Sequence, residues 1–181
     1  MISFNNVNPI GSLYEKSQCK DEKTNDKEPK LVEIISYCLN RNHYHLILEQ
    51  VAEKGIEKFM HKLGLGYTNY FNEKNTRSGS LFQGAYKAIH VDSNEYLLHL
   101  SAYVNLNFKV HQFGNSVPKF WMSSWEEYCG KKSNQKEICS KDIVLGQFKS
   151  IEDYIKFAED SLVDIQERKK RGEELGNLFL E

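Results

Sequence analysis

The 181-residue sequence lacks several features that would assign it to a particular class of protein. No apolar run approaches the roughly 18 residues that a membrane-spanning helix needs. The segment from Met1 to Ile10 has neither the basic start nor the hydrophobic stretch of a signal peptide. The four cysteines include no C-x-x-C pair, so their spacing favours neither a zinc knuckle nor a redox pair. We therefore expect a cytoplasmic protein with no membrane partner.

A net charge of one sign is also missing. The chain carries 24 lysines and arginines against 25 acidic residues, which gives a formal net charge of −1. Whole-molecule charge therefore does not indicate a nucleic-acid partner, and any such partner has to be bound by a local patch. With 40% hydrophobic and 12% aromatic residues, the chain has enough apolar material for the core of one medium-sized domain.

Composition predicts three parts along the chain. The run Lys16–Lys30 is polar, with charges of both signs, and cannot bury enough apolar surface to offset the cost of ordering it. We expect a flexible N-terminal segment at residues 1–30, a core at 31–130 and a small C-terminal helical appendage at 131–181. Small helices are expected there, over Asp142–Gly146 and from Ile151 to Arg171.

Hydrophobic periodicity predicts the elements of the core. Apolar residues alternate or cluster in three segments expected to be strands, and they recur at helical spacing in two others. Asp92, with Glu95 three residues later, is expected to cap the second helix. The order strand, strand, helix, strand, helix predicts an α+β fold with a mainly antiparallel sheet and helices on its faces. In that order, the segments are Leu31–Leu39, His43–Leu48, Gly55–Asn72, Leu81–Val91 and Ser93–Asn107.

Two pairs of polar residues within these elements suggest chemistry. His43 and His45 flank one residue, so a strand would send both imidazoles to the same face, where they could share a divalent cation. This pattern alone is weak, since a strand histidine is more often an ordinary surface or core residue. Tyr103 and Asn107, four apart on a helix, would present a phenol and an amide together. The four residues form a coherent set for phosphoryl transfer.

The same residues, in their sequence context, resemble a known family. The chain is similar to the REP-associated tyrosine transposases, a branch of the IS200-like single-tyrosine HUH transposases. The resemblance extends from Leu31 to about Phe157, with the motifs in the family's order and at similar spacing. They are Tyr37–Leu48 (YCLNRNHYHLIL), Gly79–Ile89 (GSLFQGAYKAI), Asp92–Leu97 (DSNEYL), Tyr103–Asn107 (YVNLN) and Trp121–Tyr128 (WMSSWEEY).

The resemblance implies a ferredoxin-like or RRM-like HUH core. Family members begin with a strand and a helix before the histidine-bearing strand, whereas about thirty loop-like residues precede Leu31 here. We therefore expect a core that lacks the first strand and helix. The open sheet edge that results would be a surface on which a second copy could pair, forming a homodimer.

The resemblance also implies the chemistry. In the family the histidine pair binds Mg²⁺ or Mn²⁺, which makes His43 and His45 metal ligands and Asn107 the third protein ligand or its support. Tyr103 becomes the nucleophile that cleaves DNA through a 5′-phosphotyrosine intermediate and then allows strand transfer. The family usually has a proline directly after the asparagine, whereas this chain has Phe108, so the end of the helix is expected to differ.

The substrate implied by the resemblance is single-stranded DNA with a hairpin near the cleavage site. Arg77, Phe82, Tyr86 and Lys87 could stack on or follow such a strand. An ordinary role, in the core or in solvent, is at least as plausible for each of them individually. The alternative to the enzyme is a truncated relic that binds hairpin or single-stranded DNA without strand transfer.

Overall fold

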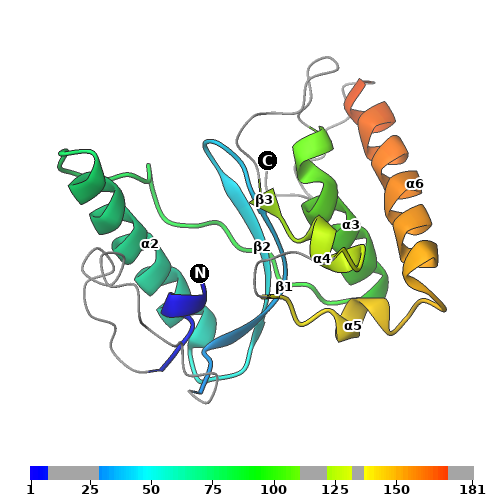
Figure 1. Ribbon diagram of the computed structural model, residues 1–181, viewed down its shortest axis with the longest axis horizontal. Helices are drawn as coiled ribbons and strands as arrows, with labels where there is room; N and C mark the ends of the chain where they lie inside the picture. The colour runs from blue at the N-terminus through cyan, green and yellow to red at the C-terminus, as the bar shows by residue number, and fades with distance from the viewer. Residues whose placement is uncertain (8–28, 111–121, 132–136, 171–181) are drawn as a thin grey trace. The chain divides into compact units, whose positions relative to one another are not determined.

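The computed structural model describes residues 1–7, 29–110, 122–131 and 137–170, and Figure 1 shows the elements in these ranges. Most of the segment expected to be flexible before Leu31 lies outside the described residues, as does Trp121. The elements are η1 (Ile2–Phe4), β1 (Val32–Leu39), β2 (Tyr44–Gln50), α2 (Gly55–Lys74), α3 (Asn94–Val110), β3 (Met122–Ser123), α4 (Trp125–Tyr128), α5 (Asp142–Leu145) and α6 (Ile151–Lys170).

The three strands form an open antiparallel sheet in the order β2-β1-β3. Strand β1 is central, and Cys38 and Leu39 lie opposite Ser123 and Met122 of β3. The chain reverses between β1 and β2 in a tight turn. A hydrogen bond from the Asn40 backbone N–H to the His43 carbonyl, at 2.9 Å, closes this turn. The combination of this sheet with several helices confirms the predicted α+β class.

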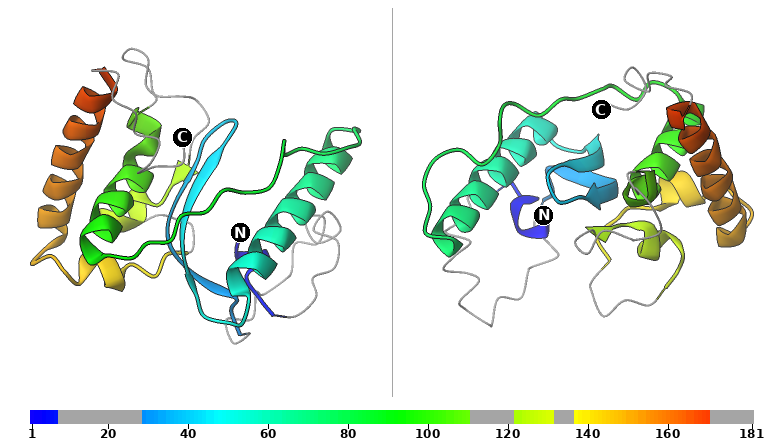
Figure 2. Two further views of the ribbon diagram at one scale, coloured as in Figure 1. Left: turned by 180° about the vertical axis from the view of Figure 1, so that it is seen from behind. Right: turned by 90° about the horizontal axis from the view of Figure 1, so that it is seen from above.

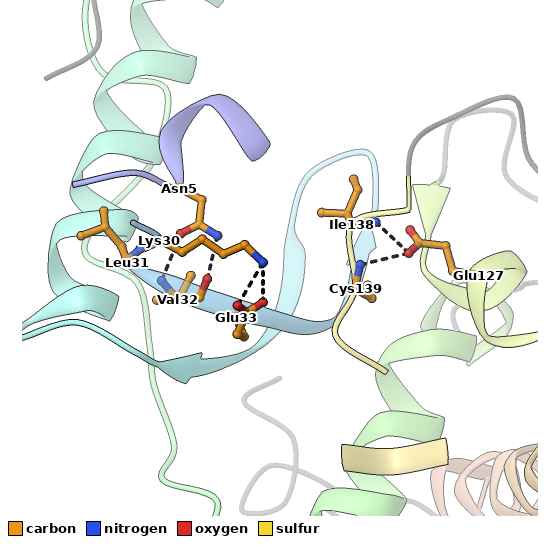
Figure 3. A network of polar contacts seen from close by, with 8 residues as sticks. All are labelled: Asn5, Lys30, Leu31, Val32, Glu33, Glu127, Ile138 and Cys139. Carbon is orange, nitrogen blue, oxygen red and sulfur yellow. Dashed lines mark hydrogen bonds and ion pairs between the residues drawn. The ribbon is translucent and has the colours of Figure 1, made fainter. Parts of the chain in front are cut away.

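The chain divides into two compact units, which separate within β1 after Glu33 and within β2 after Leu48. In the first unit, Asn5 completes the hydrogen bonding at the start of β1 (Figure 3). Its Oδ1 accepts the N–H groups of Leu31 and Val32 at 3.1 and 3.0 Å, and its Nδ2 donates to the Val32 carbonyl at 2.7 Å. One amide side chain thus satisfies backbone groups that another strand would otherwise pair.

Helix α2 is also held by close approaches within the first unit. A side chain at Gly55 would overlap the Leu31 carbonyl, and one at Gly66 would overlap the ring of Phe4. Both glycines therefore permit contacts that any larger residue would prevent. Phe59 and Met60 supply the buried side chains of α2.

The main core belongs to the second unit, where α3 packs along α6 (Figure 2). Apolar residues of β1 and β2 complete the same cluster. The central part of α3 is buried on nearly every side, and α6 contributes an amphipathic face. The most deeply buried large side chains of this core include Tyr103, Leu106, Tyr128, Val144 and Tyr154.

Glu127 of α4 holds the chain that leads into α5 (Figure 3). Its Oε2 accepts the backbone N–H groups of Ile138 and Cys139 at 2.9 and 3.0 Å. Its Oε1 accepts the phenol of Tyr37 on β1 at 3.3 Å. One carboxylate therefore joins three segments of the second unit.

The strand predicted at Leu81–Val91 was wrong. Residues 81–84 form bends, residues 85–91 have no regular structure, and most side chains between them are exposed. Residues of suitable composition form a strand only when a neighbour offers a free backbone edge, and Gly84 weakens this segment further. The third strand is Met122–Ser123 instead.

The two ends of α3 also differ from simple expectation. Asp92 was expected to cap the helix, but Ser93 does so, its Oγ accepting the Tyr96 N–H at 3.3 Å. At the other end the helix continues through Phe108 to Val110. Asn107 therefore lies inside the helix rather than at its end.

No helix within the described ranges combines the length and the apolar character needed to cross a membrane.

Candidate active site

Helix α3 carries the first pair of candidate residues, Tyr103 and Asn107. Their side chains lie one helical turn apart and are buried, with 1% and 0% of their surface exposed. Phe108 and Val110 are buried after them, so the helix continues in the core past the pair. The amide and the phenol are therefore fixed by packing rather than presented freely to solvent.

The second pair comes from the β1–β2 hairpin. His43 directly precedes β2 and His45 is the second residue of that strand. Their rings are half-buried and meet edge to face, with 5.2 Å between centroids. The ring of His45 makes a similar contact with Tyr103, at 5.6 Å between centroids. The hairpin and α3 thus bring His43, His45 and Tyr103 into one group.

Asn40 links the hairpin to Asn107. Its side-chain Nδ2 donates to Asn107 Oδ1 at 2.6 Å and lies 2.9 Å from His43 Nε2. Nothing in the local sequence singled out Asn40, because residues 40 and 107 meet only in the folded chain. The signal that could have found it is the run of polar side chains between β1 and the histidine pair.

The side chains of Asn40 and Asn42 hold the ring of His43 from both of its nitrogens. The amide nitrogen of Asn40 can only donate, so His43 Nε2 accepts. The other ring nitrogen, Nδ1, lies 2.8 Å from Asn42 Oδ1 and is the donor of that bond. The Nε2 lone pair of His43 therefore points at the Asn40 amide, and second partners that fix a ring in this way are typical of metal-binding histidines.

The donor set fits a divalent cation. His43 Nε2 and Asn107 Oδ1 both direct a lone pair at the same Asn40 nitrogen, so an imidazole nitrogen and an amide oxygen lie around a single side chain. The described part of the chain contains no cluster of three or more His, Cys, Asp or Glu residues, so the ligands of a cation here would be imidazoles and amide oxygens. Imidazole suits transition ions and amide oxygen suits harder ones, a mixture that Mn²⁺ accepts.

A buried polar network fixes the orientation of α3 behind the site. Asn105 Nδ2 donates to the Tyr154 hydroxyl of α6 at 2.8 Å, and Asn105 Oδ1 accepts the Ser124 hydroxyl. Ser124 Oγ also accepts the Tyr37 backbone N–H of β1 at 2.9 Å. Asn105 lies between Tyr103 and Asn107 in sequence, so this network sets the rotation of the helix that carries both.

Burial changes the acidity of groups around the site. Desolvation raises the pKa of Tyr154 to about 12, although hydrogen bonds from Ser101 and Asn105 act in the opposite direction. Desolvation likewise raises the pKa of the Cys38 thiol to about 11. Both groups are therefore neutral hydrogen-bonding partners at neutral pH.

The four residues expected to contact DNA belong to the first unit. Arg77, Tyr86 and Lys87 are exposed, and Phe82 is half-buried. The Arg77 guanidinium lies 5.7 Å from the centroid of Phe71, and Phe82 lies 6.5 Å from Tyr67. These contacts form an aromatic and basic surface at the end of α2, so these side chains are not core residues of the unit.

Comparison with known proteins gives one match. A family model described as Transposase IS200 like matches residues 15–107, just over half of the chain, and includes both histidines, Tyr103 and Asn107. The match begins upstream of β1, within the segment expected to be flexible. Searches of curated proteins and of solved structures found no match.

Proposed function

Because the chain belongs to the IS200-like transposase family, a family of DNA-transposing enzymes, we propose that it cleaves and rejoins single-stranded DNA through a tyrosine nucleophile. We further propose that it is an HUH enzyme of the REP-associated branch that recognises a DNA hairpin. The observation that carries the proposal is the group formed by His43, His45, Asn107 and Tyr103, drawn from two elements far apart in sequence.

In this proposal, His43, His45 and Asn107 hold Mg²⁺ or Mn²⁺. When bound, the cation would supply positive charge to polarise the scissile phosphate. His43 Nε2 and Asn107 Oδ1 both lie within hydrogen-bond distance of the Asn40 amide nitrogen, and their nearness to one group supports these two atoms as ligands. The side-chain oxygen of Asn42 that accepts His43 Nδ1–H keeps the Nε2 lone pair directed inward.

The proposed reaction exchanges one phosphodiester for another. The Tyr103 oxygen forms a bond to phosphorus, the bond from phosphorus to the 3′-oxygen breaks, and the phenol proton is transferred so that the released strand ends in a 3′-hydroxyl. The phosphotyrosine conserves the bond energy, so attack by another 3′-hydroxyl rejoins DNA without ATP. Because Tyr103 is 1% exposed, α3 or its surroundings have to move before the phenol reaches a phosphate.

The burial of Tyr103 also favours a second candidate function. A chain whose phenol stays covered could bind hairpin or single-stranded DNA without strand transfer. This is the truncated relic, and the exposed aromatic and basic surface at the end of α2 would serve it equally well.

An experiment with end-labelled DNA separates the two functions. The full chain is incubated with Mn²⁺ and a single-stranded oligonucleotide that contains a hairpin, labelled at either its 3′ or its 5′ end. The enzyme should transfer the 3′ label to protein and release a shortened 5′-labelled strand with a 3′-hydroxyl. Binding of the DNA with no labelled protein would favour the relic.

A further inference from the structure

The Asn40 amide contacts both of the atoms proposed above as ligands from different elements, Asn107 Oδ1 and His43 Nε2. Its Nδ2 is 2.6 Å from Asn107 Oδ1 and 2.9 Å from His43 Nε2, and its Oδ1 accepts the Cys38 thiol at 3.7 Å. Asn107 has no second bond to fix it, because its own Nδ2 is buried with no hydrogen-bond partner among the described residues. Asn40 therefore fixes the Asn107 amide.

The hydrogens of Asn40 Nδ2 have a clear electrostatic role in the metal-free chain. The lone pairs of His43 Nε2 and Asn107 Oδ1 both point at the Asn40 nitrogen, and they would repel one another without a positive group there. The amide N–H groups supply that partial positive charge. A cation placed against His43 and Asn107 would supply it more strongly, and the N–H groups would then face the cation unfavourably.

Turning the Asn40 amide over removes this conflict. A half-turn of the amide exchanges Nδ2 with Oδ1, which are nearly equal in size. The oxygen would then lie about as far from Asn107 Oδ1 and His43 Nε2 as the nitrogen does now. In an octahedral site with metal–ligand distances of about 2.1 Å, neighbouring ligands lie about 3 Å apart, which matches this spacing.

Cys38 accommodates both orientations. Its thiol donates weakly to Oδ1 in the present arrangement, and its sulfur can weakly accept an N–H after the turn. We propose that Asn40 is a further ligand of the cation, through its side-chain oxygen Oδ1. In the metal-free chain its amide has the opposite orientation, with Nδ2 directed at His43 and Asn107. This inference rests on the metal site proposed above, and it adds a ligand from the hairpin turn, three residues before His43.

The test measures Mn²⁺ binding by the full chain without DNA, using the electron paramagnetic resonance signal of free Mn²⁺. Asn40→Ala removes the oxygen and should weaken Mn²⁺ binding at least tenfold. Asn40→Asp keeps an oxygen but has no N–H to donate, so it should bind Mn²⁺ at least as tightly as the parent. Asn75→Ala, the same change at an exposed position of the first unit, should leave the affinity unchanged.

Thermal unfolding without metal supplies a second readout. Asn40→Asp should melt below the parent, because its carboxylate cannot donate to Asn107 or His43, and Mn²⁺ should raise its melting temperature by more than it raises the parent's. An Asp variant that binds Mn²⁺ more weakly than the parent, despite its added negative charge, would overturn the inference. If Asn40→Ala fails to fold, the Asp variant alone decides between these results.

The parent and the double variant His43→Ala with His45→Ala distinguish failure of this inference from failure of the proposed function. If the parent binds Mn²⁺ and the double variant does not, the metal site is supported. Parent-like binding by Asn40→Ala would then overturn only the role of Asn40. If the parent binds no more Mn²⁺ than the double variant, the proposed metal site and the role of Asn40 both fail.

Discussion

The Asn105 amide donates to the Tyr154 hydroxyl at 2.8 Å, and this buried bond joins α3 to α6. Neither residue belongs to the candidate site, yet Asn105 lies between Tyr103 and Asn107 on the same helix. Tyr154 is fully buried and also contacts the rings of Trp125 and Tyr128. The C-terminal helix therefore helps to determine the rotation of α3.

Removing the Tyr154 hydroxyl should destabilise the fold. Tyr154→Phe retains the ring but leaves the buried Asn105 amide with an unsatisfied N–H, which should lower the free energy of unfolding by about 1–3 kcal/mol. Urea denaturation measures the change. Tyr67→Phe is the matched control, because Tyr67 is exposed and should give less than about 0.5 kcal/mol. Equal effects of the two changes would contradict this role for the network.

Alkaline pH should destabilise the protein through the same tyrosine. Burial raises the pKa of Tyr154 to about 12, above the value of about 10 in an unfolded chain. The folded state therefore holds the phenol proton more tightly. Its contribution to stability is complete below about pH 10 and is lost as the pH rises towards 12, by about 1.4 kcal/mol per pH unit.

The measurement is the free energy of unfolding at a series of pH values. Burial also raises the pKa values of Tyr37 and Tyr128, so the parent should lose stability steeply in this range. Tyr154→Phe should lose it less steeply, by one proton's contribution. An identical slope in parent and variant would show that Tyr154 does not account for the effect.

Local patterns were enough to predict most of the second unit's elements. Strands β1 and β2 and helices α3 and α6 follow from hydrophobic periodicity, which depends only on neighbours in sequence. The strand predicted at Leu81–Val91 failed because a strand also needs a partner edge. The bond between Asn40 and Asn107 could not be predicted, because it spans 67 residues and exists only after the hairpin packs on α3.

The histidine pair should be essential for cleavage but not for DNA binding. The double change His43→Ala with His45→Ala removes both imidazoles from the proposed metal site, whereas DNA affinity depends mainly on phosphate contacts elsewhere. Cleavage of a hairpin oligonucleotide should disappear while gel-shift affinity stays within a few-fold of the parent's. In the parent, Mn²⁺ should support cleavage at least as well as Mg²⁺. Unaltered cleavage by the double variant would remove the metal assignment.

The basic side chains of Arg77 and Lys87, which follow α2 in the chain, should contribute to DNA affinity. Arg77 and Lys87 are exposed, so replacing both by alanine should weaken binding of single-stranded DNA and reduce its salt dependence. The slope of log K against log salt should become shallower by about 0.7 for each phosphate that the variant no longer neutralises. Lys58→Ala, an exposed lysine near the start of the same helix, is the control. An equal weakening in the control would indicate general electrostatics rather than a defined surface.

The role of one oxygen atom is tested by Tyr103→Phe. The ring remains buried against His45 and the rest of the core, so the variant should fold and should bind a hairpin oligonucleotide with nearly the parent's affinity. It should form no covalent DNA adduct and release no 3′-hydroxyl fragment, because the nucleophilic oxygen beside His45 is gone. Denaturing gels of 3′-labelled DNA measure the adduct, and circular dichroism measures folding.

The site of attachment decides how the result is interpreted. In the parent, mass spectrometry of the digested adduct should locate the phosphodiester on Tyr103. An adduct that persists in Tyr103→Phe and maps to another tyrosine would move the active site away from α3. If the parent binds DNA but forms no adduct with either Mn²⁺ or Mg²⁺, the buried phenol does not reach a phosphate, and the protein acts by binding DNA alone.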